Sequence, residues 1–496
     1  MPTVSASPPH VTVSTFGSTP ACRSALATFV TSICFGQYGT GVFSKPEMPF
    51  AAVISPAVTA RRAGGRHGYP NAGTDVAGSW AARVFRCYPV SLVVLAPYVL
   101  FILPVAVVYE NPDLGTLVRL TGLALAGSFV VETVALPFRR SGLGWNRGAR
   151  AANDHPRIYA VARGVAMVSI LADLTGVIVG RGTVFTQVSG SLPESPLGSL
   201  SALVSGWSAL AVALLISAAL GGRANTRGVA GWLLALALTQ ALLVVMTARA
   251  SPLLGFISFL AAAGVISGIV RARYLAVAAV VLALAWPAIF ELRNDIREGG
   301  GVTVSEQVTA DDRLRLDLQM SAVAHHRVPV DLPKPGPEDY LRYGLVPRVL
   351  DTDRPMISTG TMINQYLGGS AISAYSFLTL GNVYFLDGPW AVVAYYGLWS
   401  ALVVVLLRAG GPPGPVRLAA LCFTLAGPLL WSGTYPDSMI AIIQHMVSAV
   451  PVFVLLGLTG RVGRSGGRQH AGRHRPAGTT EFGYALPARV AGVARP

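Results

Sequence analysis

The chain has 496 residues, of which 52% are hydrophobic and 12% are charged, and its mean hydropathy is +0.54. Long uncharged apolar stretches of this kind are typical of transmembrane helices rather than of a soluble core. Lys and Arg exceed Asp and Glu by 38 to 23, and in a membrane protein such an excess indicates basic cytoplasmic loops and attraction to anionic lipid, not nucleic acid.

The four cysteines form no recognisable pairing or metal-binding pattern. None of them falls in a CxxC spacing, and no His/Cys cluster accompanies them. We therefore expect neither a disulfide framework nor a zinc site, and we expect no metal or other cofactor.

Residues 1 to about 80 are rich in Ser, Pro, Gly, Ala and Thr and show no sustained period. The apolar stretch Ala25–Phe35 is short and broken by polar residues, and no basic region opens the chain, so it makes a poor signal peptide. The composition predicts a disordered N-terminal region over 1–80.

From Tyr88 onward, about ten stretches are apolar and long enough to cross a bilayer. They predict an all-α integral membrane protein with about ten transmembrane helices and one large external loop. Seven of these helices fall within 88–290 and three within 388–459. The expected spans are 88–109, 115–136, 158–180, 200–220, 229–248, 252–270, 274–290, 388–407, 416–435 and 438–459.

The distribution of arginine supports this count, because cytoplasmic loops carry an excess of basic residues. Arginines are concentrated in alternate connections, for example between residues 137 and 157, whereas the intervening turns hold only Arg181 and Arg249. A basic tail over 460–496 holds seven arginines and one glutamate. The alternation predicts a multi-pass protein of the plasma membrane with both termini in the cytoplasm.

One connection is far longer than the others. Between Phe290 and Tyr366 it carries 12 of the 23 acidic residues and nine basic ones, and the alternation puts it outside the cell. Prolines and aromatic residues punctuate it, so we expect a loop that folds against the outer face and has a function. We assign 291–387 to an external catalytic loop that ends in a partly re-entrant segment.

The loop opens with "FELRNDIREGGG", in which Arg293 and Arg297 stand four residues apart. If the preceding span continues as a helix, the two share one face and emerge where a phosphate or lipid head group lies. The alternative is a solvated helix end with Glu291 or Asp295 as local partners.

The stretch "VPRVLDTDRP" displays a second pair, Arg348 and Arg354, between prolines that favour extended backbone before them. Arginine offers a planar fork of donors suited to bidentate phosphate contacts. The alternative is a surface turn in which Asp351 and Asp353 neutralise both arginines.

The segment Met362–Trp399 is half apolar and full of Gly, Ser and Asn before a clean span starts at Gly388. Irregular backbone at membrane depth survives only against protein or a water-filled cavity, so this region predicts the wall of an outward-facing cavity. Ionisable residues inside spans usually face a bundle interior, and two of them are candidates for the same cavity. The residues expected to line it are Asn364, Tyr366, Tyr384, Asp173 and His445.

The order of these features resembles the bacterial O-antigen polymerases and related oligosaccharide repeat-unit polymerases. Those proteins show a Pro-Arg pair, an apolar pair and a basic-Pro pair, and then a Gly-x-x-Tyr segment that leads into a Gly-rich helix start. The resemblance covers roughly residues 290–400 and includes "ELRNDIREGG", although Asp351 and Thr352 replace the aromatic residue usual between the pairs. The matching residues are Pro347 with Arg348, Arg354 with Pro355, and Gly381 with Tyr384.

The resemblance implies a metal-independent glycosyltransferase of the cell envelope. It would transfer glycan repeat units from a polyprenyl-pyrophosphate carrier to a lipid-linked acceptor on the outer face of the membrane. Fixed arginines would stabilise the charge on the departing pyrophosphate. Its partners would be the lipid-linked oligosaccharide, the bilayer, a flippase and a chain-length regulator, with no nucleic acid. The expected pyrophosphate ligands are Arg293, Arg297, Arg348 and Arg354.

A base for the acceptor hydroxyl is needed as well, and four residues are candidates. His325 and His326 have a convenient pKa, whereas Asp351 and Asp353 lie between arginines that would weaken them as bases. Two rival functions stay open. A ligase that moves a finished glycan would use the same arginines, and a secondary transporter would show interrupted helices in both of two paired halves.

Overall fold

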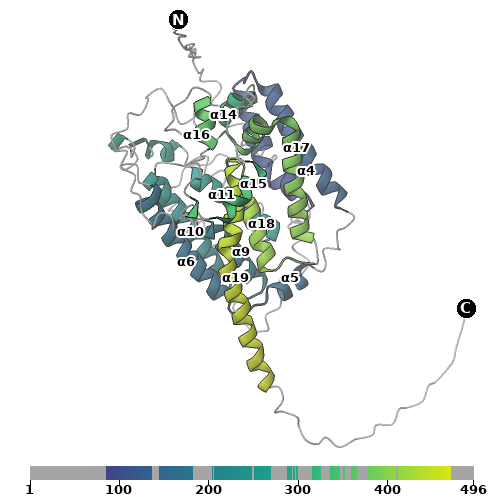
Figure 1. Cartoon of the computed structure of the whole chain (residues 1–496), viewed down its shortest axis with the longest axis vertical. Helices are drawn as coiled ribbons and strands as arrows, with labels where there is room; N and C mark the ends of the chain where they lie inside the picture. The colour runs from purple at the N-terminus through teal and green to yellow at the C-terminus, as the bar shows by residue number, and fades with distance from the viewer. Residues whose placement is uncertain are drawn as a thin grey trace, which may run out of the picture.

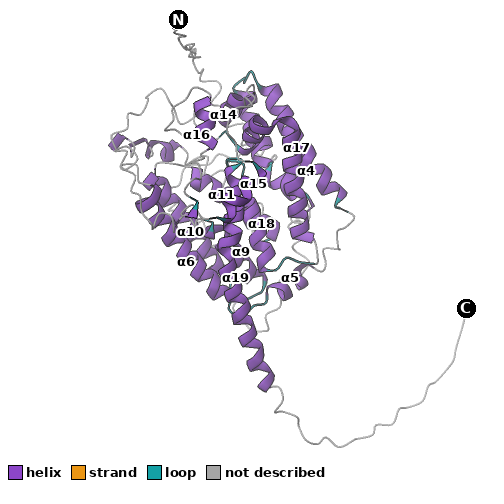
Figure 2. Ribbon diagram, viewed as in Figure 1, coloured by secondary structure: helices purple, strands orange, loops and turns teal. Residues whose placement is uncertain are grey.

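The computed structural model is all-helical in the part of the chain that it describes, and that part contains no strand (Figure 2). The predicted disordered region over 1–80 and the tail beyond residue 470 lie outside it. The described residues are 85, 87–136, 145–181, 201, 204, 206–247, 251–269, 287–292, 294–295, 298–299, 315–324, 336–346, 350–351, 359–366, 377–408 and 411–470.

Six helices are long and apolar enough to cross a membrane, and they run from 19 to 30 residues. At about 1.5 Å per residue the shortest rises about 28 Å, close to the ~30 Å thickness of a hydrocarbon core. The prediction of a helical membrane protein is therefore confirmed. The spans are Val90–Val108 (η2, Val90–Val94; η3, Tyr98–Ile102; α3, Leu103–Val108), Leu114–Val134 (α4), Ile158–Val179 (α6, Ile158–Gly176, then η5, Val177–Arg181), Thr226–Thr247 (α10), Thr379–Arg408 (α17) and Asp437–Leu458 (within α19, Asp437–His470).

The predicted count of about ten is not confirmed. Three more apolar helices coincide with predicted spans but are shorter than a bilayer is thick. The last of them ends well before residue 435 because Gly427 leaves the helical region (φ −112°, ψ −101°) and Pro428 follows it. Residues 274–286 of a further predicted span lie outside the described part. The shorter helices are α9 (Trp207–Leu220), α11 (Ser251–Ser267) and α18 (Pro415–Ala426).

Helix α9 forms the centre of the bundle. Every residue from Ala209 to Ala218 is buried, and this stretch is apolar on all sides except for Ser217. Such a helix needs neighbours all round it, and α6 and α18 pack along it. Because protein surrounds α9, its 14 residues do not have to match the bilayer thickness on their own.

Helices α4 and α17 run in the same direction and pack along their lengths (Figure 1). Glycine permits the close approach: a Cβ on Gly127 would lie 2.4 Å from the carbonyl oxygen of Val393, and one on Gly397 would lie 3.4 Å from the carbonyl oxygen of Gly127. Within α17, Gly388 adopts φ 83° and ψ −172° and divides the helix into two parts. This break falls at the residue where the sequence predicts that the clean span begins.

The bundle has two distinct ends (Figure 1). At one end, which we call the α14 end, α14 packs on α3, α4 and α17, and α16 lies close to α14 in the view. At the opposite end, which we call the α5 end, α5 (Trp145–Asn153) packs on α9. The predicted external loop thus contributes helices to the α14 end. Those helices are α14 (Leu316–Ala324), α15 (Pro337–Leu345) and α16 (Thr359–Tyr366).

Candidate functional site

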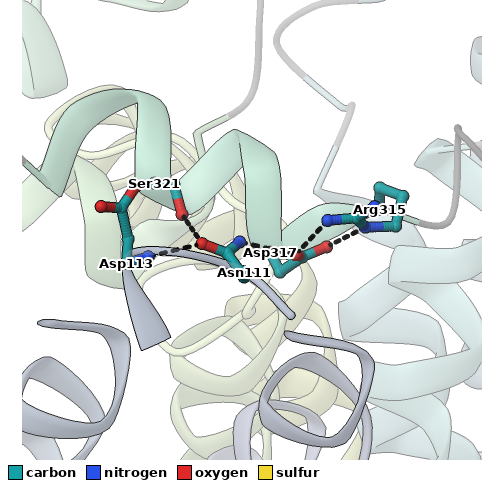
Figure 3. Close-up of polar contacts among 5 residues, drawn as sticks. All are labelled: Asn111, Asp113, Arg315, Asp317 and Ser321. Atoms are coloured by element: carbon teal, nitrogen blue, oxygen red, sulfur yellow. Dashed lines mark hydrogen bonds and ion pairs between the residues drawn. The ribbon is translucent and has the colours of Figure 1, made fainter. Parts of the chain in front are cut away.

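A network of hydrogen bonds holds α14 to the turn between α3 and α4 (Figure 3). The Asp317 carboxylate is fully buried; it accepts two bonds from the Arg315 guanidinium, both 2.9 Å, and one from Asn111 Nδ2 at 2.6 Å. Asn111 Oδ1 accepts from Ser321 Oγ at 3.3 Å and from the backbone N–H of Asp113 at 2.8 Å. Every side chain of this network therefore has a partner.

The local sequence explains why the network forms at this place. Asp317 lies in the first turn of α14, where a helix favours negative charge. Arg315 stands just before that helix, and its Cζ lies 4.3 Å from the centre of the Tyr109 ring, which ends α3. Arg315 is thus held by a carboxylate and by an aromatic face, and its side chain is 16% exposed.

Helix α15 lies against α19 by close packing. A Cβ on Gly344 would lie 2.7 Å from the Cβ of Ile443, so the two helices touch backbone to side chain. The next residue of α19 adds a hydrogen bond: Gln444 Nε2 donates to the carbonyl oxygen of Tyr343 at 2.8 Å. At the start of α15, Pro337 and an Asp339 carboxylate that accepts from the Gly336 N–H define the first turn.

An ion pair follows the end of α15. Arg342 Nη2 lies 2.6 Å from Asp351 Oδ1; the arginine side chain is 52% exposed and the aspartate side chain 8%. The hydrogen bond and the charge of Asp351 raise the pKa of Arg342 above its usual value. The second carboxylate oxygen of Asp351 is buried, and no donor in the described part of the chain reaches it.

A second attachment to α19 stands at the start of α16. Thr359 Oγ1 donates to Asp437 Oδ1 at 2.7 Å, and the Thr359 N–H donates to Oδ2 at 3.3 Å. Asp437 begins α19 and Gln444 follows seven residues later, about 10 Å along the axis. The two ends of the segment 346–358 are therefore tied to one short stretch of α19.

A tyrosine and a carboxylate meet where α17 breaks. Tyr435 Oη donates to Asp387 Oδ2 at 2.7 Å, and Asp387 is exposed and directly precedes Gly388. Tyr340 of α15 is a second polar neighbour of Tyr435. Burial first, and then the bond with Asp387, raise the pKa of Tyr435 far above its usual value, so its hydroxyl keeps the proton that it donates.

The segment between α18 and α19 is irregular but well bonded. Thr379 donates its N–H to the carbonyl oxygen of Trp431 at 3.0 Å, and Tyr98 Oη donates to the same oxygen at 3.2 Å. Trp431 Nε1 donates to Ser258 Oγ at 2.9 Å. Both the carbonyl and the indole N–H of Trp431 are thus bonded to protein groups, as irregular backbone in a membrane protein requires.

Most of the predicted reaction residues lie outside the described residues. The cavity residue Asn364 lies in α16, but its side chain is outside them as well. Their roles stay predictions. The residues concerned are Arg293, Arg297, His325, His326, Arg348, Asp353 and Arg354.

The other predicted residues have described surroundings, which do not test their expected roles. Tyr366 is 39% exposed and its ring centre lies 5.6 Å from that of Phe385, whereas Tyr384 packs against the main core. Asp173 Oδ2 accepts from Gln240 Nε2 at 3.1 Å. His445 packs on Phe423 with ring centres 5.7 Å apart.

Sequence reasoning missed several polar residues at the α14 end. Asn111 and Asp317 stand 206 residues apart, and Asp387 and Tyr435 stand 48 apart, so no local pattern pairs them. One signal was present: Asp387 directly precedes the Gly-Pro pair at the start of the predicted span. In the described part of the chain, no group of three His, Cys, Asp or Glu side chains is arranged to hold a metal ion.

Comparison with protein-family models, with curated proteins and with solved structures gave no match in any of the three. The sequence pattern and the geometry of the α14 end are therefore the observations that bear on the function of this chain.

Proposed function

We propose that this chain is a polysaccharide polymerase of the plasma membrane. It would transfer glycan repeat units from a polyprenyl-pyrophosphate carrier to a lipid-linked acceptor at the α14 end, which would face the outside of the cell. Its substrates would reach it through the bilayer, with a flippase supplying them and a chain-length regulator limiting the product.

The attachment of the segment 346–358 at both ends supports this proposal most directly. Tyr343 and Thr359 are bonded to α19 at Gln444 and Asp437, and Arg348 and Arg354 belong to the segment between these attachments. Two arginines that fall in sequence between two attachments to the end of a membrane bundle suit an anion that is itself held at the membrane surface. A polyprenyl pyrophosphate is such an anion.

The chemistry requires fixed positive charge at this level. Cleaving the bond between the anomeric carbon and the pyrophosphate oxygen leaves the electron pair, and hence negative charge, on the pyrophosphate. Guanidinium groups that are already oriented stabilise that charge without reorganisation, most strongly where little water is present. Arginine also binds phosphate in a bidentate manner, which fixes the leaving group.

The ion pair of Asp351 bears on the alternative in which aspartates neutralise both arginines. One oxygen of Asp351 is bonded to Arg342 at 2.6 Å. Asp351 is therefore already engaged by an arginine that the alternative does not include. One of the two Asp351 oxygens is thus not available to neutralise Arg348 or Arg354 as the alternative requires.

The two rivals differ from the proposal in product. A ligase would attach a finished glycan once, and it would use the same charge on the same leaving group. A secondary transporter would move its substrate without changing it. The lengthening of the glycan with time in reconstituted membranes separates the polymerase from both.

The decisive experiment replaces the two arginines. Arg348→Ala or Arg354→Ala should lower the rate of polymer formation about 30- to 1000-fold, because each charge-assisted contact in a sequestered site contributes roughly 2–4 kcal/mol to the transition state. Lys should rescue position 354 better than position 348, since the family resemblance tolerates Lys only there. Arg223→Ala is the matched control, because Arg223 is paired with Asp154 near the α5 end.

Wild-type polymer length in both alanine variants, at matched protein level, would contradict the proposal. The orientation has its own test. A cysteine introduced between residues 301 and 314 should react with an impermeant reagent from outside the cell, and one between 471 and 490 should not. The opposite labelling pattern would remove lipid-linked glycans from the list of substrates, because the arginines would then face the cytoplasm.

A further inference from the structure

The break in α17 sets the depth of Asp387. The second part of α17 runs from Pro389 to Arg408, 20 residues that rise about 30 Å, close to the thickness of a hydrocarbon core. Arg408 is fixed at the α5 end, because its guanidinium donates to the carbonyl oxygens of Ala135 and Cys87 at 2.8 and 3.0 Å. A hydrocarbon core that matches this second part would place Asp387 at the opposite membrane–water boundary.

The surroundings of Asp387 agree with that depth. Trp390, three residues further on, is 81% exposed, and exposed tryptophans gather at the boundary between hydrocarbon and head groups. Gly388 has open space on its side-chain face, since a Cβ there would meet no atom within 4 Å. The carboxylate thus stands next to a glycine whose side-chain face is open.

The Asp387 carboxylate is held in place by Tyr435, which is itself packed against Tyr395. Tyr435 donates to the carboxylate, and the Tyr435 ring packs edge-on against Tyr395 with centres 5.4 Å apart. Tyr395 is itself fixed, because its hydroxyl donates to the carbonyl oxygen of Pro428 at 2.7 Å. An exposed carboxylate with an oriented hydroxyl behind it is the arrangement that a positioned base requires.

We propose that Asp387 is the general base that takes the proton from the acceptor sugar hydroxyl, and that Tyr435 positions it. This inference rests on the proposed function. The acceptor oxygen forms a bond to the anomeric carbon of the donor while its proton moves to the Asp387 carboxylate. The bond from the anomeric carbon to the pyrophosphate oxygen breaks, and its electron pair leaves with the pyrophosphate.

Depth argues for Asp387 over the loop residues considered from sequence. The attacked carbon is bonded directly to the pyrophosphate, which lies among the lipid head groups. The acceptor hydroxyl must approach that carbon to about 3 Å, and the base must lie within one hydrogen bond of the hydroxyl. A base for this reaction therefore belongs at the membrane–water boundary, where a hydrocarbon core that matches the second part of α17 would place Asp387.

The test uses full-length protein in proteoliposomes, with the radiolabelled lipid-linked oligosaccharide pool extracted from the native membranes as substrate. Asp387→Asn should lower the rate at saturating substrate about 100-fold or more, with the half-saturating concentration unchanged, because a general base contributes 10²- to 10⁴-fold to the rate and little to binding. Asp387→Glu should restore part of that rate. Tyr435→Phe should lower it about 5- to 10-fold, again without weaker binding. Asp154→Asn near the α5 end is the control.

The outcomes separate this inference from the proposed function. If wild-type protein does not lengthen the glycan, the proposed function fails, and this inference falls with it. If wild-type protein is active and Asp387→Asn stays within threefold of it, only the assignment of the base is overturned. If the Asp387→Asn protein does not accumulate in cells, Tyr435→Phe provides the test, because it leaves the Asp387 carboxylate in place. An unchanged rate at saturating substrate in Tyr435→Phe would then overturn the proposal.

Discussion

The two ends of the bundle use polar side chains differently. At the α5 end several buried polar side chains bond to the backbone of another element: Glu132 accepts from the N–H of Val90 at 2.8 Å, and Asn153 donates to the carbonyl oxygen of Pro413 at 3.0 Å. Both of these side chains are fully buried. At the α14 end several polar side chains bond to one another, and some of these pairs reach the surface, as in Arg342–Asp351 and Asp387–Tyr435.

The difference distinguishes contacts that fix how helices pack from contacts that a ligand could replace. A side chain that bonds to buried backbone satisfies a group that cannot otherwise be solvated, so it fixes how helices meet. A side chain that bonds to another side chain near water can exchange that partner for a ligand. We therefore expect substitutions at the α5 end to change stability first, and substitutions at the α14 end to change activity first.

Asp317 should give the largest loss of stability. It lies at the α14 end, but its side chain is fully buried, as the polar side chains that fix helix packing at the α5 end are. Asp317→Ala should lower the free energy of unfolding by about 3–5 kcal/mol, since it leaves Arg315 and Asn111 with unpaired donors in a buried place. Thermal unfolding in detergent measures the loss. Glu291→Ala, at an exposed position, should stay within about 0.5 kcal/mol of wild type. A loss equally small for Asp317→Ala would show that α14 is not held by this network.

Glu132 tests the α5 end. Its carboxylate accepts from the N–H of Val90 and from Ser91 Oγ at 2.8 and 2.6 Å. Glu132→Ala therefore leaves the N–H of Val90 without this acceptor and leaves Ser91 with Ser128 as its side-chain partner. We expect a loss of about 2–4 kcal/mol in unfolding free energy, and a much smaller loss for Glu132→Gln, which keeps an acceptor. Activity per folded molecule should not change in either variant. Reduced activity in a well-folded Glu132→Gln variant would contradict the expectation that substitutions at the α5 end change stability and not activity.

Gly344 tests the contact between α15 and α19. A methyl group at this position would lie 2.7 Å from the Cβ of Ile443, so Gly344→Ala should cost about 1–3 kcal/mol and should move α15, together with the start of the segment 346–358, away from α19. The rate of glycan polymerisation should fall as well. Gly115→Ala in α4 is a matched control with no atom within 4 Å, and it should be neutral or slightly stabilising. Identical behaviour of the two variants would mean that α15 tolerates displacement.

Arg342 should give the smallest change in stability, because its side chain is half-exposed and solvent screens the pair with Asp351. Arg342→Gln should leave the unfolding midpoint at the wild-type value. It should still lower the rate of polymerisation, because the released Asp351 becomes free to pair with Arg348 or Arg354. Higher salt should reduce the difference from wild type by screening the new pair. A variant that loses stability but keeps its activity would reverse the roles assigned to the two ends.

The sequence by itself determined the class of the protein and several of its boundaries. Six apolar stretches fall on helices of spanning length, because each carries its own hydrophobic length and its own end signals. The break in α17 could also be predicted, since Gly388 adopts a positive φ that favours glycine and Pro389 cannot continue a helix from the turn before it. These are local properties of the chain.

The tertiary structure alone decided which polar residues meet. Asp351, expected beside Arg348 and Arg354, is bonded to Arg342, and Asp387 meets a tyrosine from another segment. Arg342 and Asp351 stand nine residues apart, but Asp387 and Tyr435 are brought together only after helices have packed. That packing depends on small residues such as Gly127 and Gly344, which set how closely two helices approach. Composition and periodicity predict where each helix begins and ends, but they do not predict which face of a helix will pack against which neighbour.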